Sequence, residues 1–182
     1  MHNKNKFFLY LVSLIIISLM ACSKNDKKNI EFKFNANNEY IGFKDLNFIS
    51  LKEAEKNGYV IYEKGYPSSG QELWDNFLKD SLEEINTQIR IYKVNDDMQS
   101  EYIDIFYRNN LYYVFSSNAT NNKDKDNAYK YLYDLNNTTL NNTFFIVASN
   151  SSDITYTKVI NSLLSSKLIN TKDFRILIMG MR

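Results

Sequence analysis

"EYIDIFYRNNLYYVFSS", residues 101–117, is the stretch of sequence that decides the fold. Two runs rich in aromatic and β-branched residues stand on either side of Asn109-Asn110. Asparagine tolerates the positive φ that a tight hairpin turn requires of both its central residues. The stretch therefore predicts a β-hairpin with a two-residue turn, in which Tyr107 lies opposite Tyr112.

This register divides the side chains of the hairpin between two faces, because successive residues of a strand point in opposite directions. One face is apolar enough to lie beneath helices and carries Ile103, Ile105, Tyr107, Tyr112 and Val114. The other face combines aromatic rings with an acid and a guanidinium. We take as a candidate binding face its residues Tyr102, Asp104, Phe106, Arg108, Tyr113 and Phe115.

Rings beside charged groups are typical of surfaces that bind a peptide or a sugar. The same pattern also fits a face that is covered, or one that is simply rich in strand-forming residues. Residues 128–135, "AYKYLYDL", would cover the face if they folded over it, and strands favour aromatic residues in any case. Residues 128–135 fit either a helix or a strand, and we expect a helix.

Two units of strand, helix and strand flank the hairpin, at 59–94 and 144–179. In the first unit the apolar residues after Ser69 recur at helical spacing and include Trp74 and Phe77. Each unit is a candidate right-handed crossover between parallel strands. A shorter helix is expected at 51–57, where the sequence has the form of a capping box.

The sequence therefore predicts an α+β fold. We expect a single mixed β-sheet with two main amphipathic helices packed on one face. The two strand–helix–strand units flank the β-hairpin in this arrangement.

The N-terminal residues follow one another in the order that is typical of a signal peptide. Lys4 and Lys6 precede an apolar run at 7–20, and the small Ala21 precedes Cys22, the only cysteine. The run is short for a membrane-spanning helix. Leu19-Met20-Ala21-Cys22 resembles the lipobox of bacterial lipoproteins, which implies cleavage between Ala21 and Cys22 and acyl chains on the Cys22 sulfur.

Three regions follow from this leader. Residues 1–21 would be the removed signal peptide, and 22–38 the lipidated cysteine with a polar tether. Residues 39–182 would form a single globular α+β domain. An alternating piece at 30–34 is compatible with an edge strand.

The composition excludes several kinds of chemistry. The leader holds His2, the only histidine, so the mature chain has no imidazole, and its one thiol is assigned to lipid. Ser–His and Cys–His nucleophile pairs are thereby excluded, as are zinc sites built from His and Cys. We therefore expect no catalytic residue, no bound metal and no cofactor.

Charge argues against a nucleic-acid partner. The leader carries two of the 22 basic residues and none of the 21 acidic ones, so the mature chain has 20 basic and 21 acidic side chains. Proteins that bind nucleic acids have a basic excess or a basic stripe.

The stretch "SLKEAEKNGYVIYEKG" at 50–65, the helix with Trp74 and Phe77, and Ile89-Arg90-Ile91 carry a resemblance. Together with the hairpin they are similar to a family of small lipoproteins of unknown function from Gram-positive bacteria, over about 50–120. The resemblance implies an envelope location and transfers no functional residue.

We therefore expect a cell-envelope lipoprotein on the extracytoplasmic face of the cell membrane. Its partners would be the membrane, through lipid on Cys22, and an envelope protein, peptide or glycan that it binds without catalysis. One alternative is a carboxylate-dependent hydrolase, which needs two acids facing one bond. Another is an immunity or inhibitor lipoprotein that protects its own cell from an envelope toxin.

Overall fold

The computed structural model describes residues 30–95, 97, 99–120, 122–123, 126–137, 142–165 and 174–181. These residues form three helices and nine strands. In chain order they are α2 (Leu51–Lys56), β1 (Val60–Glu63), β2 (Tyr66–Ser69), α3 (Gln71–Leu82), β3 (Thr87–Val94), β4 (Ser100–Arg108), β5 (Leu111–Ser116), β6 (Ala128–Tyr129), β7 (Tyr131–Asn137), β8 (Thr143–Ser149), α4 (Tyr156–Leu164) and β9 (Phe174–Met181).

The strands form two sheets. The larger sheet has the order β2-β1-β3-β4-β5-β6, and it is mixed because β1 and β3 are parallel while its other neighbours are antiparallel. The smaller sheet, β7-β8-β9, is antiparallel. The α+β class and the mixed sheet are confirmed, but the strands are divided between two sheets instead of the single sheet expected.

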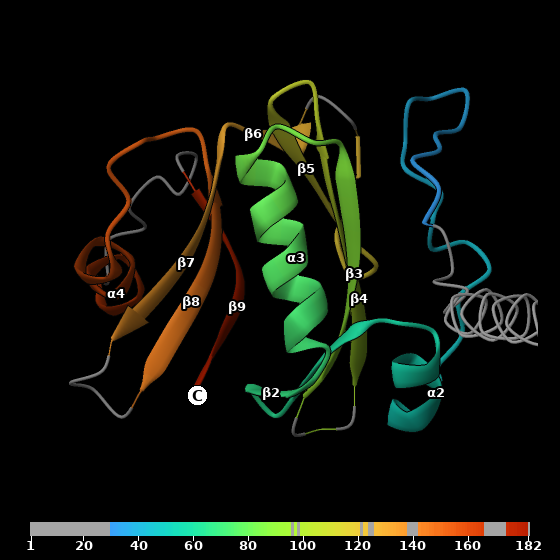
Figure 1. The fold of residues 1–182 in the computed structure, drawn as a ribbon, viewed down its shortest axis with the longest axis horizontal. Coiled ribbons are helices and arrows are strands. Elements are labelled where there is room, and N and C mark those ends of the chain that lie inside the picture. The colour runs from blue at the N-terminus through green and yellow to red at the C-terminus, as the bar shows by residue number, and fades with distance from the viewer. Residues whose placement is uncertain are drawn as a thin grey trace, which may run out of the picture.

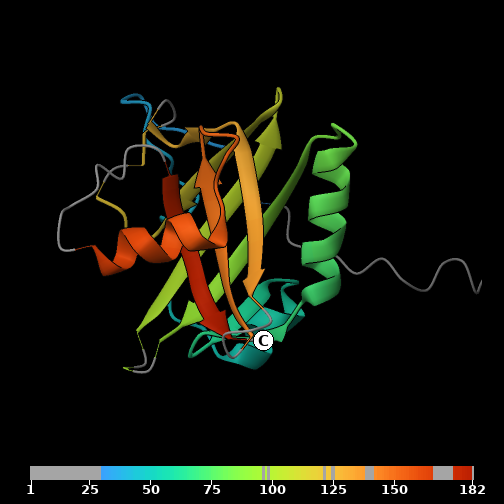
Figure 2. The ribbon, with the colours of Figure 1, turned by 90° about the vertical axis from the view of Figure 1, so that its left-hand side faces the viewer.

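The two sheets face each other, with α3 alongside the space between them (Figure 1). The second view shows α4 lying across the outer side of the smaller sheet (Figure 2). The chain from residue 30 to α2 lies on the outer side of the larger sheet. The two main helices therefore pack in different layers, not on one face of one sheet.

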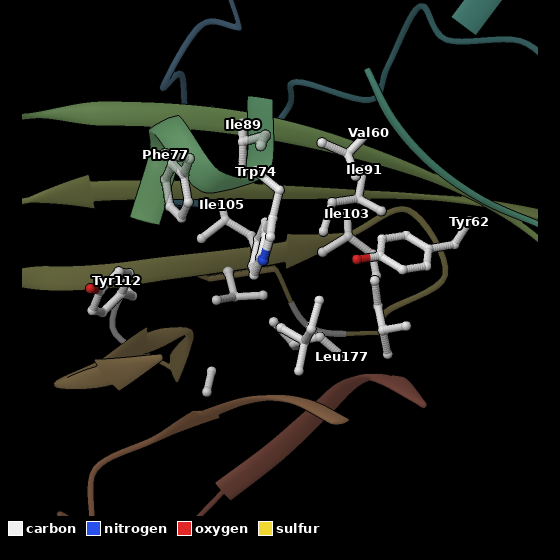
Figure 3. Packing of buried hydrophobic residues seen from close by; sticks show 14 of the residues in the cluster. Val60, Tyr62, Trp74, Phe77, Ile89, Ile91, Ile103, Ile105, Tyr112 and Leu177 are labelled. Carbon is white, nitrogen blue, oxygen red and sulfur yellow. The ribbon is translucent and has the colours of Figure 1, made fainter. Parts of the chain in front are cut away.

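The main core lies where α3 and both sheets meet (Figure 3). Trp74 and Phe77 of α3 are buried against isoleucines of β3 and β4, and Leu177 approaches from β9. The indole Nε1 of Trp74 donates a hydrogen bond of 3.1 Å to Asp134 of β7. Trp74 thus joins the helix to the smaller sheet, and the apolar face that the helical spacing predicts is buried.

The helix α3 begins at Gln71, two residues after Ser69. Its N-cap is Gly70, whose φ is +85°. A side chain at Gly70 would stand 2.9 Å from the backbone of Tyr59 and Val60, so only glycine fits this turn. The helix ends at Leu82, which leaves Ile85 outside it and half exposed.

The hairpin has the expected geometry. Asn109 and Asn110 have φ of 50° and 60°, and Tyr107 pairs with Tyr112 across the turn. The parallel pairing of β1 with β3 around α3 also confirms the first strand–helix–strand unit as a crossover.

The second unit differs from its prediction, because β9 runs antiparallel to β8. Apolar periodicity records which face an element buries, but it does not record the direction of the next strand. The continuous apolar run of β8 has a simple cause: both of its faces are covered. Phe144 and Ile146 join the main core, whereas Phe145 and Val147 pack beneath α4.

The expected helix at 128–135 is wrong, since these residues form β6 and the start of β7. The chain leaves the larger sheet after Tyr129 and joins the smaller one at Tyr131. Leu132 then packs on the main core, and Tyr133 and Leu135 pack under α4. This alternation between two covered faces favours a strand.

Candidate functional site

The six residues of the candidate binding face do share one face of the hairpin. Phe106 pairs with Tyr113 and Asp104 with Phe115, in the expected register. These side chains point away from α3, toward the outer side of the larger sheet. The prediction of which side chains lie together is therefore confirmed.

The face is not an open surface, however. Tyr102, Asp104, Phe106 and Phe115 are buried, with exposed fractions of 5%, 0%, 0% and 0%. Arg108 and Tyr113 are half-buried. The covering segment is residues 30–43 and not residues 128–135, which were one alternative, and the face is not exposed.

Aromatic contacts hold the covering segment in place. Phe32 packs edge-on against Phe106, with ring centroids 4.8 Å apart, and Arg108 lies over the Phe32 ring at the same distance. Tyr40 stacks on Phe115 at 4.3 Å. The polar tether was expected to include residues 30–38, yet Ile30 is only 9% exposed and packs on this cluster. The domain therefore includes at least part of that stretch.

Beneath the covering segment lies a buried charged cluster. Arg90 and Asp104 are direct partners across β3 and β4. Arg90 donates from Nε to Oδ1 at 2.6 Å and from Nη2 to Oδ2 at 2.5 Å. Tyr40 donates its hydroxyl to Oδ2 at 2.6 Å, and Nη2 of Arg90 also donates to the Gly42 carbonyl at 3.2 Å. One carboxylate thus joins the sheet to the covering segment.

The electrostatics of this cluster favour a structural role. Burial raises the pKa of the Asp104 carboxyl, and the hydrogen bonds and charge of Arg90 oppose that rise. Burial alone would lower the pKa of Arg90, but Asp104 outweighs it and the pKa is raised. Burial and the Asp104 charge likewise raise the pKa of Tyr40. Asp104 accepts three hydrogen bonds and its side chain is fully buried, so it is not placed to act on a substrate.

Sequence reasoning missed Tyr40 and Arg90 of this cluster, and of the two it is Arg90 that has a recognisable signal in the sequence. Its signal is an arginine between two isoleucines in a strand, on the same face as Tyr92. A guanidinium in such a place needs an acidic partner nearby. Three rings also surround it, those of Phe43, Tyr59 and Tyr102, with centroids 5.5–5.7 Å from Cζ.

A groove of about 650 Å³ lies between the edge of the smaller sheet and one end of the larger sheet. Lys64, Lys93, Asn95 and Asp97 line it from the larger sheet and its loops. Ile176, Leu177 and Met179 line it from β9. Met179 is 58% exposed, so the groove presents an exposed apolar side chain together with Lys64 and Lys93.

Two smaller cavities of about 300 and 350 Å³ share Ile30 and Arg90 in their linings. Glu31 and Asp45 both line the larger of these two. Both are exposed, and Glu31 is paired with Lys33 at 3.0 Å. Solvated carboxylates at a rim lack the buried setting that a hydrolytic acid–base pair uses.

Ala21 and Cys22 lie outside the described residues. Among the residues that the structure describes, no group of three His, Cys, Asp or Glu side chains could hold a metal ion. None of the described helices is long and apolar enough to cross a bilayer.

No family model, curated protein or solved structure matches the chain.

Proposed function

We propose that this chain is a lipid-anchored protein of the cell envelope that acts by binding a partner and not by catalysis. The leader and Cys22 support the location at the cell envelope, as does the resemblance to small Gram-positive lipoproteins. The absence of imidazole from the mature sequence supports the non-catalytic role. So does the state of Asp104, which is closed off by Arg90 and Tyr40.

The groove beside β9 is the partner site that the geometry supports best. Within the described residues β9 is an edge strand, paired with β8 on one side only. On its other side Met181 N–H donates to the Gly65 carbonyl at 3.0 Å, at the end of the strand. An unpaired edge is a template for an extended chain, which adds to the sheet as a further strand.

The lining of the groove indicates the chemistry of this peptide. Met179 and Ile176 offer apolar contacts on the β9 side. Lys64 is exposed on the other side and forms no ion pair with any described residue. Lys93, by contrast, forms an ion pair with Glu101, with Nζ 3.4 Å from the carboxylate oxygen. The partner is therefore an extended peptide segment of an envelope protein, with apolar side chains and a carboxylate that Lys64 attracts.

Two measurements test this function. Mass spectrometry of the native protein should find acyl chains on Cys22 and no residue before it. A bare sulfur or an attached leader would contradict the proposed lipid anchor. The purified protein should retain extended acidic–apolar peptides on an array, and Met179→Asp should weaken the best of them by about tenfold or more.

Leu164→Asp is the matched control. Leu164 is more exposed than Met179, and it lies on α4 and does not line the groove. It should leave peptide binding unchanged. Equal loss in both variants, or no binding to any peptide, would contradict the groove. If the bound partner proves to be a toxic envelope enzyme, the protein is an immunity lipoprotein that uses the same groove.

A further inference from the structure

We propose that the outer surface of residues 43–52 faces the bilayer, with Phe48 inserted among the lipid head groups. This inference rests on the proposed anchor at Cys22 and adds to it an orientation of the domain. Its partner is a lipid surface, and its evidence is the reach of the anchor, the rigidity of the loop and the exposure of one ring.

The reach of the anchor is short. The described chain starts at Ile30, which is 9% exposed and packs on the outer face of the larger sheet. Only eight residue steps separate it from Cys22, a span of at most about 28 Å. The outer face of the larger sheet must then stay near the bilayer, because Ile30 is part of what covers it. A 17-residue tether, as the sequence alone suggested, would leave the orientation free.

The loop that carries Phe48 is fixed from below. Tyr102 donates its hydroxyl to the Asn47 carbonyl at 2.7 Å, and Tyr92 donates its hydroxyl to the Ile49 carbonyl at 2.8 Å. The residues on both sides of Phe48 are therefore bound to the sheet. Leu46 and Ile49 pack inward beside it.

Phe48 itself points outward and is 65% exposed, the largest exposed fraction of any aromatic ring among the exposed apolar residues of the described chain. A single exposed ring is common on protein surfaces. This ring, however, stands on a fixed loop over the same outer face of the larger sheet that residues 30–43 cover. Aromatic side chains favour the boundary between lipid and water.

The charges around Phe48 are compatible with this contact. Lys44 and Lys52 are exposed near it in the chain, and Asp45 and Glu53 balance them. Long lysine side chains can reach phosphate groups while their stems lie along apolar surface. Because the charges balance, insertion of the ring is what holds the surface on the bilayer. The groove stays accessible in this orientation, since its lining comes from β9 and from one end of the larger sheet, and none of it belongs to residues 43–52.

Tryptophan fluorescence tests the orientation. The complete mature chain, from Cys22, is coupled through this thiol, its only one, to a maleimide lipid in phosphatidylcholine vesicles. Trp74 is the only tryptophan and is fully buried, so the parent protein gives a constant background. In Phe48→Trp, brominated acyl chains should quench about half of the added emission, since interfacial side chains lie at the depth of the head group and upper acyl region.

The matched control is Leu164→Trp, at a position that is 79% exposed on α4, on the opposite side of the molecule. It should show no quenching, and a twenty-residue Gly-Ser insertion after residue 29 should reduce quenching of Phe48→Trp. Equal quenching at both positions, or none at Phe48→Trp, would overturn the proposal. A bare Cys22 in the native protein is read separately by mass spectrometry, so failure of the anchor is distinguishable from failure of the orientation.

Discussion

Arg90 and Asp104 are the pair on which the outer layer of this molecule depends. Two charge-assisted hydrogen bonds join them in a site that is 6% exposed for Arg90 and 0% for Asp104. Tyr40 and Gly42 of the covering segment bind to the same pair. Burying both charges is costly, and that cost is offset only while each keeps its partner.

Removing the cation alone should therefore destabilise the protein strongly. We expect Arg90→Met to lower the free energy of unfolding by about 3–5 kcal/mol, because Asp104 stays buried without a counter-charge. Urea denaturation followed by Trp74 fluorescence measures this change. The double variant Arg90→Met/Asp104→Leu should recover most of the loss, since no buried charge remains. A single variant as stable as the parent protein would show that water reaches Asp104.

Tyrosine burial predicts a loss of stability in alkali. Burial, with Tyr92 and Tyr59 nearby, raises the pKa of Tyr102 to about 12, and burial and Asp104 raise that of Tyr40. An unfolded tyrosine ionises near pH 10. The folded state thus favours the protonated hydroxyl, so this contribution is complete below pH 10 and is lost as the pH rises toward 12.

Urea denaturation at a series of pH values checks this expectation. The free energy of unfolding should fall from pH 10 upward, and the fall should be smaller in Tyr102→Phe. An identical pH dependence in that variant would mean that other groups cause the alkaline transition.

At the scale of elements, the hairpin of β4 and β5 has a turn that depends on two asparagines. Asn109 and Asn110 both have positive φ, which most side chains avoid. The turn sets the register that places Phe106 beside Tyr113 on one face and Tyr107 beside Tyr112 on the other. Both sides of the larger sheet are packed, so a slip by one residue would misplace every side chain of the hairpin.

Asn110 offers a direct test of this turn. We expect Asn110→Val to lower the free energy of unfolding by about 1–2 kcal/mol, because a β-branched residue is strained at φ of 60°. Asn110→Gly should be neutral or slightly stabilising, since glycine accepts this φ without strain. Both values come from urea denaturation. Equal stability of the two variants would contradict the turn.

At the scale of the whole molecule, the two sheets meet at a backbone seam near the C-terminal end of β9. Met181 N–H donates to the Gly65 carbonyl, and Gly180 lies directly against Gly65. A Cβ at Gly180 would overlap the Gly65 carbonyl oxygen and crowd the Phe144 ring. Glycine at 180 is thus what allows β9 to approach the turn between β1 and β2.

Gly180→Ala should open this seam. We expect it to lower the free energy of unfolding by about 1–3 kcal/mol, because the added methyl group displaces backbone and not a flexible side chain. The neighbouring exposed Met179 supplies the control, since Met179→Ala should change stability by about 0.5 kcal/mol or less. Thermal or urea denaturation compares them. An unchanged Gly180→Ala would mean that the two sheets are not in contact there.

Sequence patterns predicted well wherever contacts are local. The hairpin register, the helix at Leu51–Lys56 and the burial of Trp74 all follow from residues close together in the chain. The candidate face was also correctly assembled, since strand alternation requires only the turn. The segment that covers this face was not predicted, because the apolar pattern at 30–34 spans only a few residues and is interrupted by charged ones.

The sequence by itself determined which side chains of the hairpin share a face and where the short helix α2 starts, because turn chemistry, capping and side-chain period are local properties. Only the tertiary structure decided that residues 30–43 close over the aromatic face, that β8 and β9 run antiparallel, and that 128–137 crosses between two sheets. These outcomes depend on packing between segments far apart in the chain. The free energy of such contacts is set by shape and partner, which no local pattern records.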